Sequence, residues 1–155
     1  MRTAAIIAFL SFAGTAGAQT IVAADYIEPT ERYAHGILGD GIEHAGLEVT
    51  LSDGSKRTAV WLELVVFEDT NPCLVDLDGD GAPEMITVET HENFGARLSV
   101  WGIDDSNGFV NLAATGYIGR PFRWLAVVGA ADIDGDGHME IAYVDRPHLA
   151  KTLMV

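Results

Sequence analysis

Short apolar runs rich in β-branched residues alternate with clusters of Gly, Asp and Ser along the chain. Residues 48–51 and 58–62 flank Ser52-Asp53-Gly54-Ser55, and residues 98–103 and 109–113 flank the turn cluster 104–108. Runs of this length and composition are typical of strands, and Asp-Gly tolerates the positive φ of a tight hairpin. No window after residue 18 keeps a helical period. The pattern therefore predicts an all-β fold that contains two hairpins at these places.

Residues 19–32 show no such clear pattern and are expected to form a loosely ordered lead-in. A stronger feature follows further along, because Val75–Ile86 (VDLDGDGAPEMI) recurs as Ala131–Ala142 (ADIDGDGHMEIA). Each copy lies between two apolar runs that are predicted to be strands. An internal repeat of this kind is typical of proteins built from stacked, similar units.

The similarity continues beyond the two motifs, since residues 96–101 resemble residues 150–155. The second unit therefore reaches Val155 in the middle of an expected strand. We expect the chain to be a fragment of a longer repeat protein. The alternative is a natural C-terminal strand that pairs to close the fold.

Both copies carry four acids at the same offsets, in the pattern D-x-D-G-D-G-x-x-E. Alternate side chains of a tightly curled loop can converge on one point, and calcium takes about 6–8 oxygen ligands in a flexible geometry. Carboxylates held together without a cation repel one another. Glycine at the sixth position, Gly81 or Gly137, permits the sharp turn back. We predict two calcium ions, with the seventh residue of each loop offering its backbone carbonyl; the ligands are Asp76, Asp78, Asp80, Ala82 and Glu84, and Asp132, Asp134, Asp136, His138 and Glu140.

An EF-hand begins with a similar pattern but needs a Glu at the twelfth position and a helix after the loop. Here the twelfth residues are Thr87 and Tyr143, and a strand is predicted after each loop. The motif instead resembles the FG-GAP or VCBS repeat, the calcium-binding blade repeat of integrin-α-like β-propellers. The resemblance covers roughly residues 60–155, and the 56 residues between Asp76 and Asp132 are near the size of a four-stranded blade.

This resemblance implies a partial β-propeller-like array of FG-GAP/VCBS blades with calcium loops between strands. The expected organisation is a signal peptide over 1–18, an N-terminal β segment or degenerate blade over 19–70, and two calcium repeats over 71–155, the second truncated. The family does not imply one activity, because such repeats occur in proteins with many different tasks.

The charge of the chain supports this interpretation. The 9 Lys and Arg residues stand against 23 Asp and Glu residues, which gives a formal net charge of −14. Nucleic acid and anionic lipid both need clustered positive charge and are therefore excluded as partners. Eight of the acids are the predicted calcium ligands. The single cysteine, Cys73, rules out an intrachain disulfide.

The N-terminus has the layout of a secretory signal peptide. Arg2 is followed by an apolar run over residues 4–12 and by Ala16-Gly17-Ala18, a small-x-small cleavage site. This predicts cleavage after Ala18 and export to a periplasm or the outside. No membrane span is expected, because the run is too short to cross a bilayer.

One segment concentrates positive charge and aromatic rings in this acidic chain: Arg120, Phe122, Arg123 and Trp124. Such clusters are favoured in recognition surfaces, which suggests a protein or glycan partner. The alternative is that the aromatics are core residues and the arginines pair with nearby acids. His35 and His44, near Asp40 and Glu43, match no strong zinc pattern and are expected to be ordinary loop histidines.

The sequence favours an exported calcium-binding repeat protein that serves as a structural, binding or adhesion module and is not an enzyme. Its serines lack the context of a hydrolase nucleophile. The alternative is a non-catalytic or accessory part of a secreted hydrolase that acts on polysaccharide or phosphoester.

Overall fold

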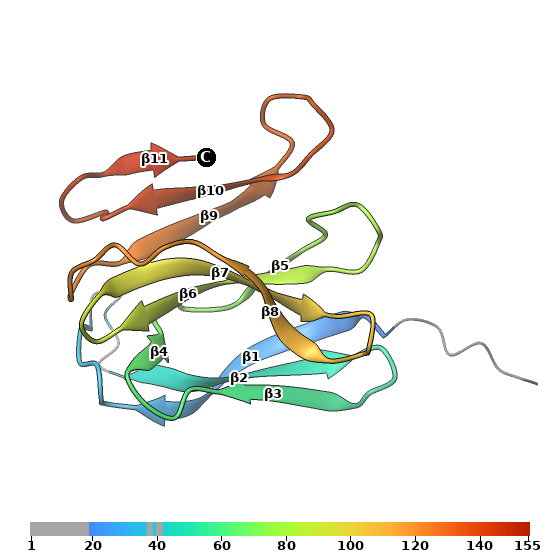
Figure 1. Ribbon diagram of the computed structural model, residues 1–155, viewed down its shortest axis with the longest axis horizontal. Coiled ribbons are helices and arrows are strands. Elements are labelled where there is room, and N and C mark those ends of the chain that lie inside the picture. The colour runs from blue at the N-terminus through green and yellow to red at the C-terminus, as the bar shows by residue number, and fades with distance from the viewer. Residues whose placement is uncertain (1–18, 37–38, 40–41) are drawn as a thin grey trace, which may run out of the picture.

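The computed structural model describes residues 19–36, 39 and 42–155 (Figure 1). The predicted signal peptide and its cleavage site fall on residues 1–18, outside the described residues, so both stay predictions. The described part contains strands and no helix. The strands are β1 (Ile21–Thr30), β2 (Glu43–Leu51), β3 (Lys56–Val60), β4 (Val65–Phe67), β5 (Cys73–Val75), β6 (Glu84–His91), β7 (Gly95–Ile103), β8 (Phe109–Ala114), β9 (Leu125–Ala131), β10 (Glu140–Asp145) and β11 (Thr152–Met154).

The strands form two antiparallel sheets. The larger sheet has the order β1-β2-β4-β6-β7-β8, with β3 on β2 and β5 on β6. The smaller sheet has the order β11-β10-β9. Neither sheet closes on itself, so the described part is an open array. Its all-β fold is the one that the hydrophobic pattern predicts.

The array has three layers (Figure 1). Strands β1–β3 form one outer layer, β5–β8 the middle layer, and β9–β11 the other outer layer. The short strand β4 links the first two layers, because Phe67 pairs with His44 of β2 and also with Glu89 of β6. The β5–β7 segment and the β9–β11 segment each consist of a strand, an acidic loop and a hairpin, in that order. The internal repeat of the sequence is therefore also a repeat of the structure.

Strand β6 separates two hydrophobic cores because its successive side chains point to opposite faces. Met85 packs into a core with Leu47 and Phe67, between the first layer and the middle layer. Ile86 and Val88 pack into a second core with Leu125, between the middle layer and β9–β10. The middle unit is therefore covered on both faces.

Both predicted hairpins are present. The β2–β3 turn covers residues 52–55, and the β7–β8 turn covers residues 104–108. A strand, β6 or β10, follows each acidic loop, so neither loop is an EF-hand.

The expected loose lead-in over residues 19–32 is wrong. Residues 21–30 form β1, which pairs along its length with β2. Only Ile21 of this strand is fully buried, so the strand has no regular alternation of buried and exposed side chains. The strand is ordered by backbone hydrogen bonds to a partner, and the side-chain pattern does not record those bonds.

Candidate metal sites

The first acidic loop joins β5 to β6 and is held by its own carboxylates. Asp76 accepts hydrogen bonds from the backbone N–H groups of Gly79 (2.8 Å) and Gly81 (2.9 Å), one on each oxygen. Asp78 accepts one from the N–H of Asp80 at 3.1 Å. These bonds curl the backbone around the acid that opens the motif.

The second half of the first loop is fixed in the same way. Asp80 accepts a hydrogen bond from the N–H of Ala82 at 2.7 Å. Glu84, the first residue of β6, accepts one from the N–H of Leu77 at 2.8 Å. The loop is thereby closed from its last acid back to its second residue.

The loop between β9 and β10 repeats all five bonds. Asp132 accepts from Gly135 (2.7 Å) and Gly137 (3.1 Å), Asp134 from Asp136 (3.1 Å), Asp136 from His138 (2.9 Å), and Glu140 from Ile133 (2.8 Å). Two segments with different neighbours thus adopt the same local structure. The motif itself encodes that structure, because every bond lies within the loop.

The sixth-position glycines have the conformation that was predicted for them. Gly81 has φ +89° and Gly137 has φ +92°. L-residues with a side chain rarely adopt this left-handed conformation, whereas glycine adopts it at no steric cost.

The curled loops bring acid oxygens together. Asp76, Asp78 and Glu84 each have an oxygen within 4.8 Å of the others, and so do Asp132, Asp134 and Asp136. Three hard oxygen donors at this spacing fit a calcium ion.

Two of the predicted carboxylate ligands, Asp80 and Glu140, lie outside these two groups. The predicted carbonyl ligands belong to Ala82 and His138, whose N–H groups face Asp80 and Asp136. The assignment of the whole ligand set therefore stays a prediction.

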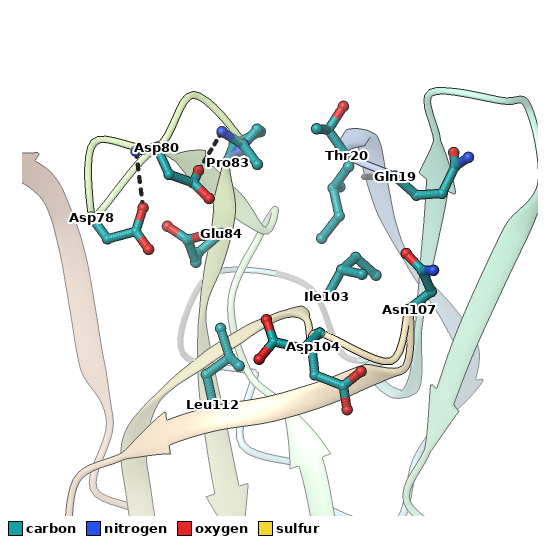
Figure 2. Close-up of a pocket in the computed structure, with 13 residues that line it drawn as sticks. Gln19, Thr20, Asp78, Asp80, Pro83, Glu84, Ile103, Asp104, Asn107 and Leu112 are labelled. Atoms are coloured by element: carbon teal, nitrogen blue, oxygen red, sulfur yellow. Dashed lines mark hydrogen bonds between the residues drawn. The ribbon is translucent and has the colours of Figure 1, made fainter. Parts of the chain in front are cut away.

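The surroundings of the two loops differ. The first loop forms one side of a pocket of about 630 Å³, where Asp78, Asp80 and Glu84 gather opposite Asp104 of the β7–β8 turn (Figure 2). Residues 131–138 of the second loop are exposed, and Glu140 is half-buried. Burial, together with the charges of Asp78 and Asp80, raises the pKa of Glu84. A bound cation would relieve this repulsion.

The Arg-aromatic segment lies between β8 and β9 and is not a core segment throughout. The Phe122 side chain is 49% exposed. Neither Arg120 nor Arg123 forms an ion pair with an acid in the described part of the chain. None of the described acids therefore pairs with these arginines, and the alternative that they pair with nearby acids stays a prediction.

A buried pair was missed by sequence reasoning. The imidazole Nδ1 of His35 contacts the carboxylate of Glu68, whose side chain is fully buried and also accepts a hydrogen bond from the Thr90 hydroxyl. Burial raises the pKa of Glu68 to about 7 and lowers the pKa of His35. No local signal could reveal this pair, because its members lie 33 residues apart.

Comparison with protein-family models matches the FG-GAP-like repeat over residues 76–143. The match runs from the first acid of the first loop, through the middle layer and the second loop, into β10. Comparison with curated proteins gives no significant match, and comparison with solved structures gives none either.

No helix in the described residues is long and apolar enough to cross a membrane. FG-GAP-like repeats are non-catalytic units of β-propeller type that serve binding and structural roles. The layered array, open at both ends and built of antiparallel strands, agrees with part of such a propeller. Over residues 76–143 the chain is similar to the FG-GAP-like repeat, which is consistent with the resemblance that the two acidic motifs carry in the sequence.

Proposed function

We propose that this protein is an exported, non-catalytic binding or structural module whose two acidic loops each bind one calcium ion. The observation that carries the proposal is the repetition of the same five hydrogen bonds, which gathers carboxylate oxygens in both loops. The signal-peptide pattern of residues 1–18 supports export.

Calcium acts here as a staple. Each loop connects two neighbouring strands of one sheet, β5 to β6 or β9 to β10. A cation that neutralises the acids would fix the turn and, with it, the register of the two strands. Since each loop supplies most of the ligands itself, little of the coordination shell is left for a substrate.

Calcium calorimetry together with thermal unfolding tests this proposal. We expect two ions per chain with affinities of about 10⁻⁴–10⁻³ M, the range of extracellular modules. At 10 mM calcium, each site should then add about 1.4–2.7 kcal/mol to the free energy of unfolding. Excess EGTA should remove that gain.

Single variants assign the ions to the loops. Asp76→Ala and Asp132→Ala should each reduce the stoichiometry from two to one. Glu63→Ala is the matched control, because Glu63 is an exposed acid between β3 and β4, outside both loops and outside the pocket beside the first loop, and it should leave two ions bound. An unchanged melting temperature in EGTA, together with no calcium heat, would contradict the proposal.

A further inference from the structure

The end of the molecule opposite the acidic loops carries two arginines, Arg120 and Arg123, that form no ion pair with a described acid. The loops precede β6 and β10, whereas the segment 118–124 lies beside the β6–β7 turn, about 25 Å away along the eight residues of β6 (Figure 1). Arg123 donates one hydrogen bond, to the carbonyl of Phe122, and Arg120 forms no ion pair with a described acid.

The effect of this charge reaches the neighbouring histidines. After burial, the positive charge of Arg123 is the next cause that lowers the pKa of both His35 and His148. Burial is the larger cause of both shifts, and at the neighbouring Tyr33 the negative charges of Glu68 and Glu43 act more strongly than the charge of Arg123. A carboxylate in direct contact with the Arg123 guanidinium would still be stabilised.

The backbone of residues 118–124 is held by hydrogen bonds to the β6–β7 turn and the start of β7. The N–H of Ala96 donates to the carbonyl of Arg123 at 2.8 Å, and the N–H of Gly119 donates to that of Phe94 at 2.8 Å. Gly95 makes the close approach possible, since a Cβ there would lie 2.2 Å from the Arg120 carbonyl oxygen. The arginines are thus presented from a fixed turn.

Phe122 is held in a strained conformation and is half-exposed. Its φ is +52°, which is an outlier for a bulky residue. Its N–H donates to the Tyr33 hydroxyl at 2.6 Å, and its ring stacks on the Tyr33 ring at 5.3 Å. Backbone strain that the surroundings maintain is often found at binding sites.

A second phenyl ring adjoins the same turn. Phe94, whose carbonyl receives the Gly119 bond, is 50% exposed and packs its ring against His91. The surface therefore combines two half-exposed aromatic residues with two arginines that form no ion pair with a described acid. We call Phe94, Arg120, Phe122 and Arg123 the arginine surface.

The chemistry of the arginine surface favours one class of ligand. A guanidinium fork pairs with a carboxylate through two charge-assisted hydrogen bonds. An exposed phenyl face offers dispersion contact to a flat, mostly C–H surface such as one face of a sugar ring. The negative field of the chain disfavours a dense polyanion. Because residues 115–124 form no strand, the segment offers no edge for an extended peptide to join.

From these observations we propose that the arginine surface binds a glycan through a sugar ring that carries one carboxylate. The proposal rests on the proposed function only in treating the protein as a binding module, and it does not depend on calcium. Arg120 and Arg123 pair with the carboxylate, while Phe94 and Phe122 contact the faces of neighbouring rings.

Calorimetry on the whole chain in calcium buffer tests this with three probes. These are a xylotetraose that carries one glucuronic acid substituent, unsubstituted xylotetraose, and a blocked tetrapeptide with one glutamate. We expect the acidic sugar to bind about 10–100-fold more tightly than the neutral sugar, since a charge-assisted bidentate pair separates them. Equal binding of the two sugars, no binding of the acidic sugar, or equally tight binding of the peptide would each overturn the proposal.

Variants locate the site. Arg120→Gln and Arg123→Gln should each weaken binding of the acidic sugar about tenfold, and Phe122→Gly should weaken it while relieving the strain. The matched control is Arg57→Gln on β3, because the Arg57 side chain bonds to its chain neighbours Ser55 and Lys56 and the change should not alter binding. Retained affinity in both Arg120→Gln and Arg123→Gln overturns the assignment, provided that melting curves show a folded protein.

A spectroscopic readout distinguishes contact from a structural effect. A bound carboxylate should raise the pKa of His148 in an NMR titration, and the neutral sugar should leave it unchanged. An unchanged pKa with the acidic sugar bound would place that sugar elsewhere. If calcium calorimetry shows no ions, the proposed function fails, while the sugar measurements still decide the arginine surface.

Discussion

The two copies of the repeat share a loop but differ in everything that surrounds it. Five hydrogen bonds recur in both loops with distances that differ by at most 0.2 Å. Matching strand positions do not share an environment: Val88 of β6 is 0% exposed, whereas its counterpart Val144 of β10 is only half-buried.

The difference shows which properties belong to the motif and which belong to the array. The loop conformation is local, because its donors and acceptors lie within nine residues. Burial is not local, because β6 lies between two layers and β10 is covered by one in the described structure. The two copies should therefore respond differently to changes in their strands and equally to changes in their loops.

The largest difference is expected at Glu89 and its counterpart Asp145. Glu89 is fully buried and accepts hydrogen bonds from Arg97 (2.6 and 2.8 Å) and from the indole N–H of Trp101 (2.9 Å). Glu89→Ala leaves these donors without a partner and should cost about 3–5 kcal/mol of unfolding free energy.

Asp145 pairs with its chain neighbour Arg146 at the surface, so Asp145→Ala should cost about 0–1 kcal/mol. Urea unfolding of both variants in the same buffer measures the difference. Glu89→Gln serves as a milder control, because it keeps an acceptor for Trp101. Equal losses from the two alanine variants would mean that the copies are not packed differently.

A smaller difference is expected in the second core. Val88→Ala removes two buried methyl groups between β6 and the outer sheet, and should cost about 1–3 kcal/mol. Val144→Ala removes the same atoms from a half-buried position, where the neighbours can relax, and should cost less than about 1 kcal/mol. Thermal unfolding in EGTA makes the comparison free of metal effects, and a larger loss from Val144→Ala would reverse the assignment of the two environments.

These pairs also show which features could be predicted from the sequence. The hairpins, the repeat and the loop glycines could be predicted because each depends on residues a few positions apart. The strand β1 could not, since its order comes from β2. The partners of Glu68 and Glu89 likewise lie on other strands or in a distant segment. An acid in a strand pattern gives no sign of whether it meets solvent or a buried arginine.

The smallest predicted difference concerns the loop glycines, where the two copies should agree. Gly81 and Gly137 have φ of +89° and +92°, and an added Cβ would contact nothing within 4 Å at either position. Gly81→Ala and Gly137→Ala should therefore each cost about 1–2 kcal/mol, from backbone strain alone.

Their difference should be within about 0.5 kcal/mol, the error of adding independent effects. Urea unfolding of both variants in EGTA measures it, and the double variant should show the sum. If Gly81→Ala costs much more than Gly137→Ala, the first loop draws part of its stability from the middle layer. The loop conformation would then depend on packing against the neighbouring layers as well as on the motif. Stability from bonds within the loop could then not be separated from stability due to packing, even for a single glycine.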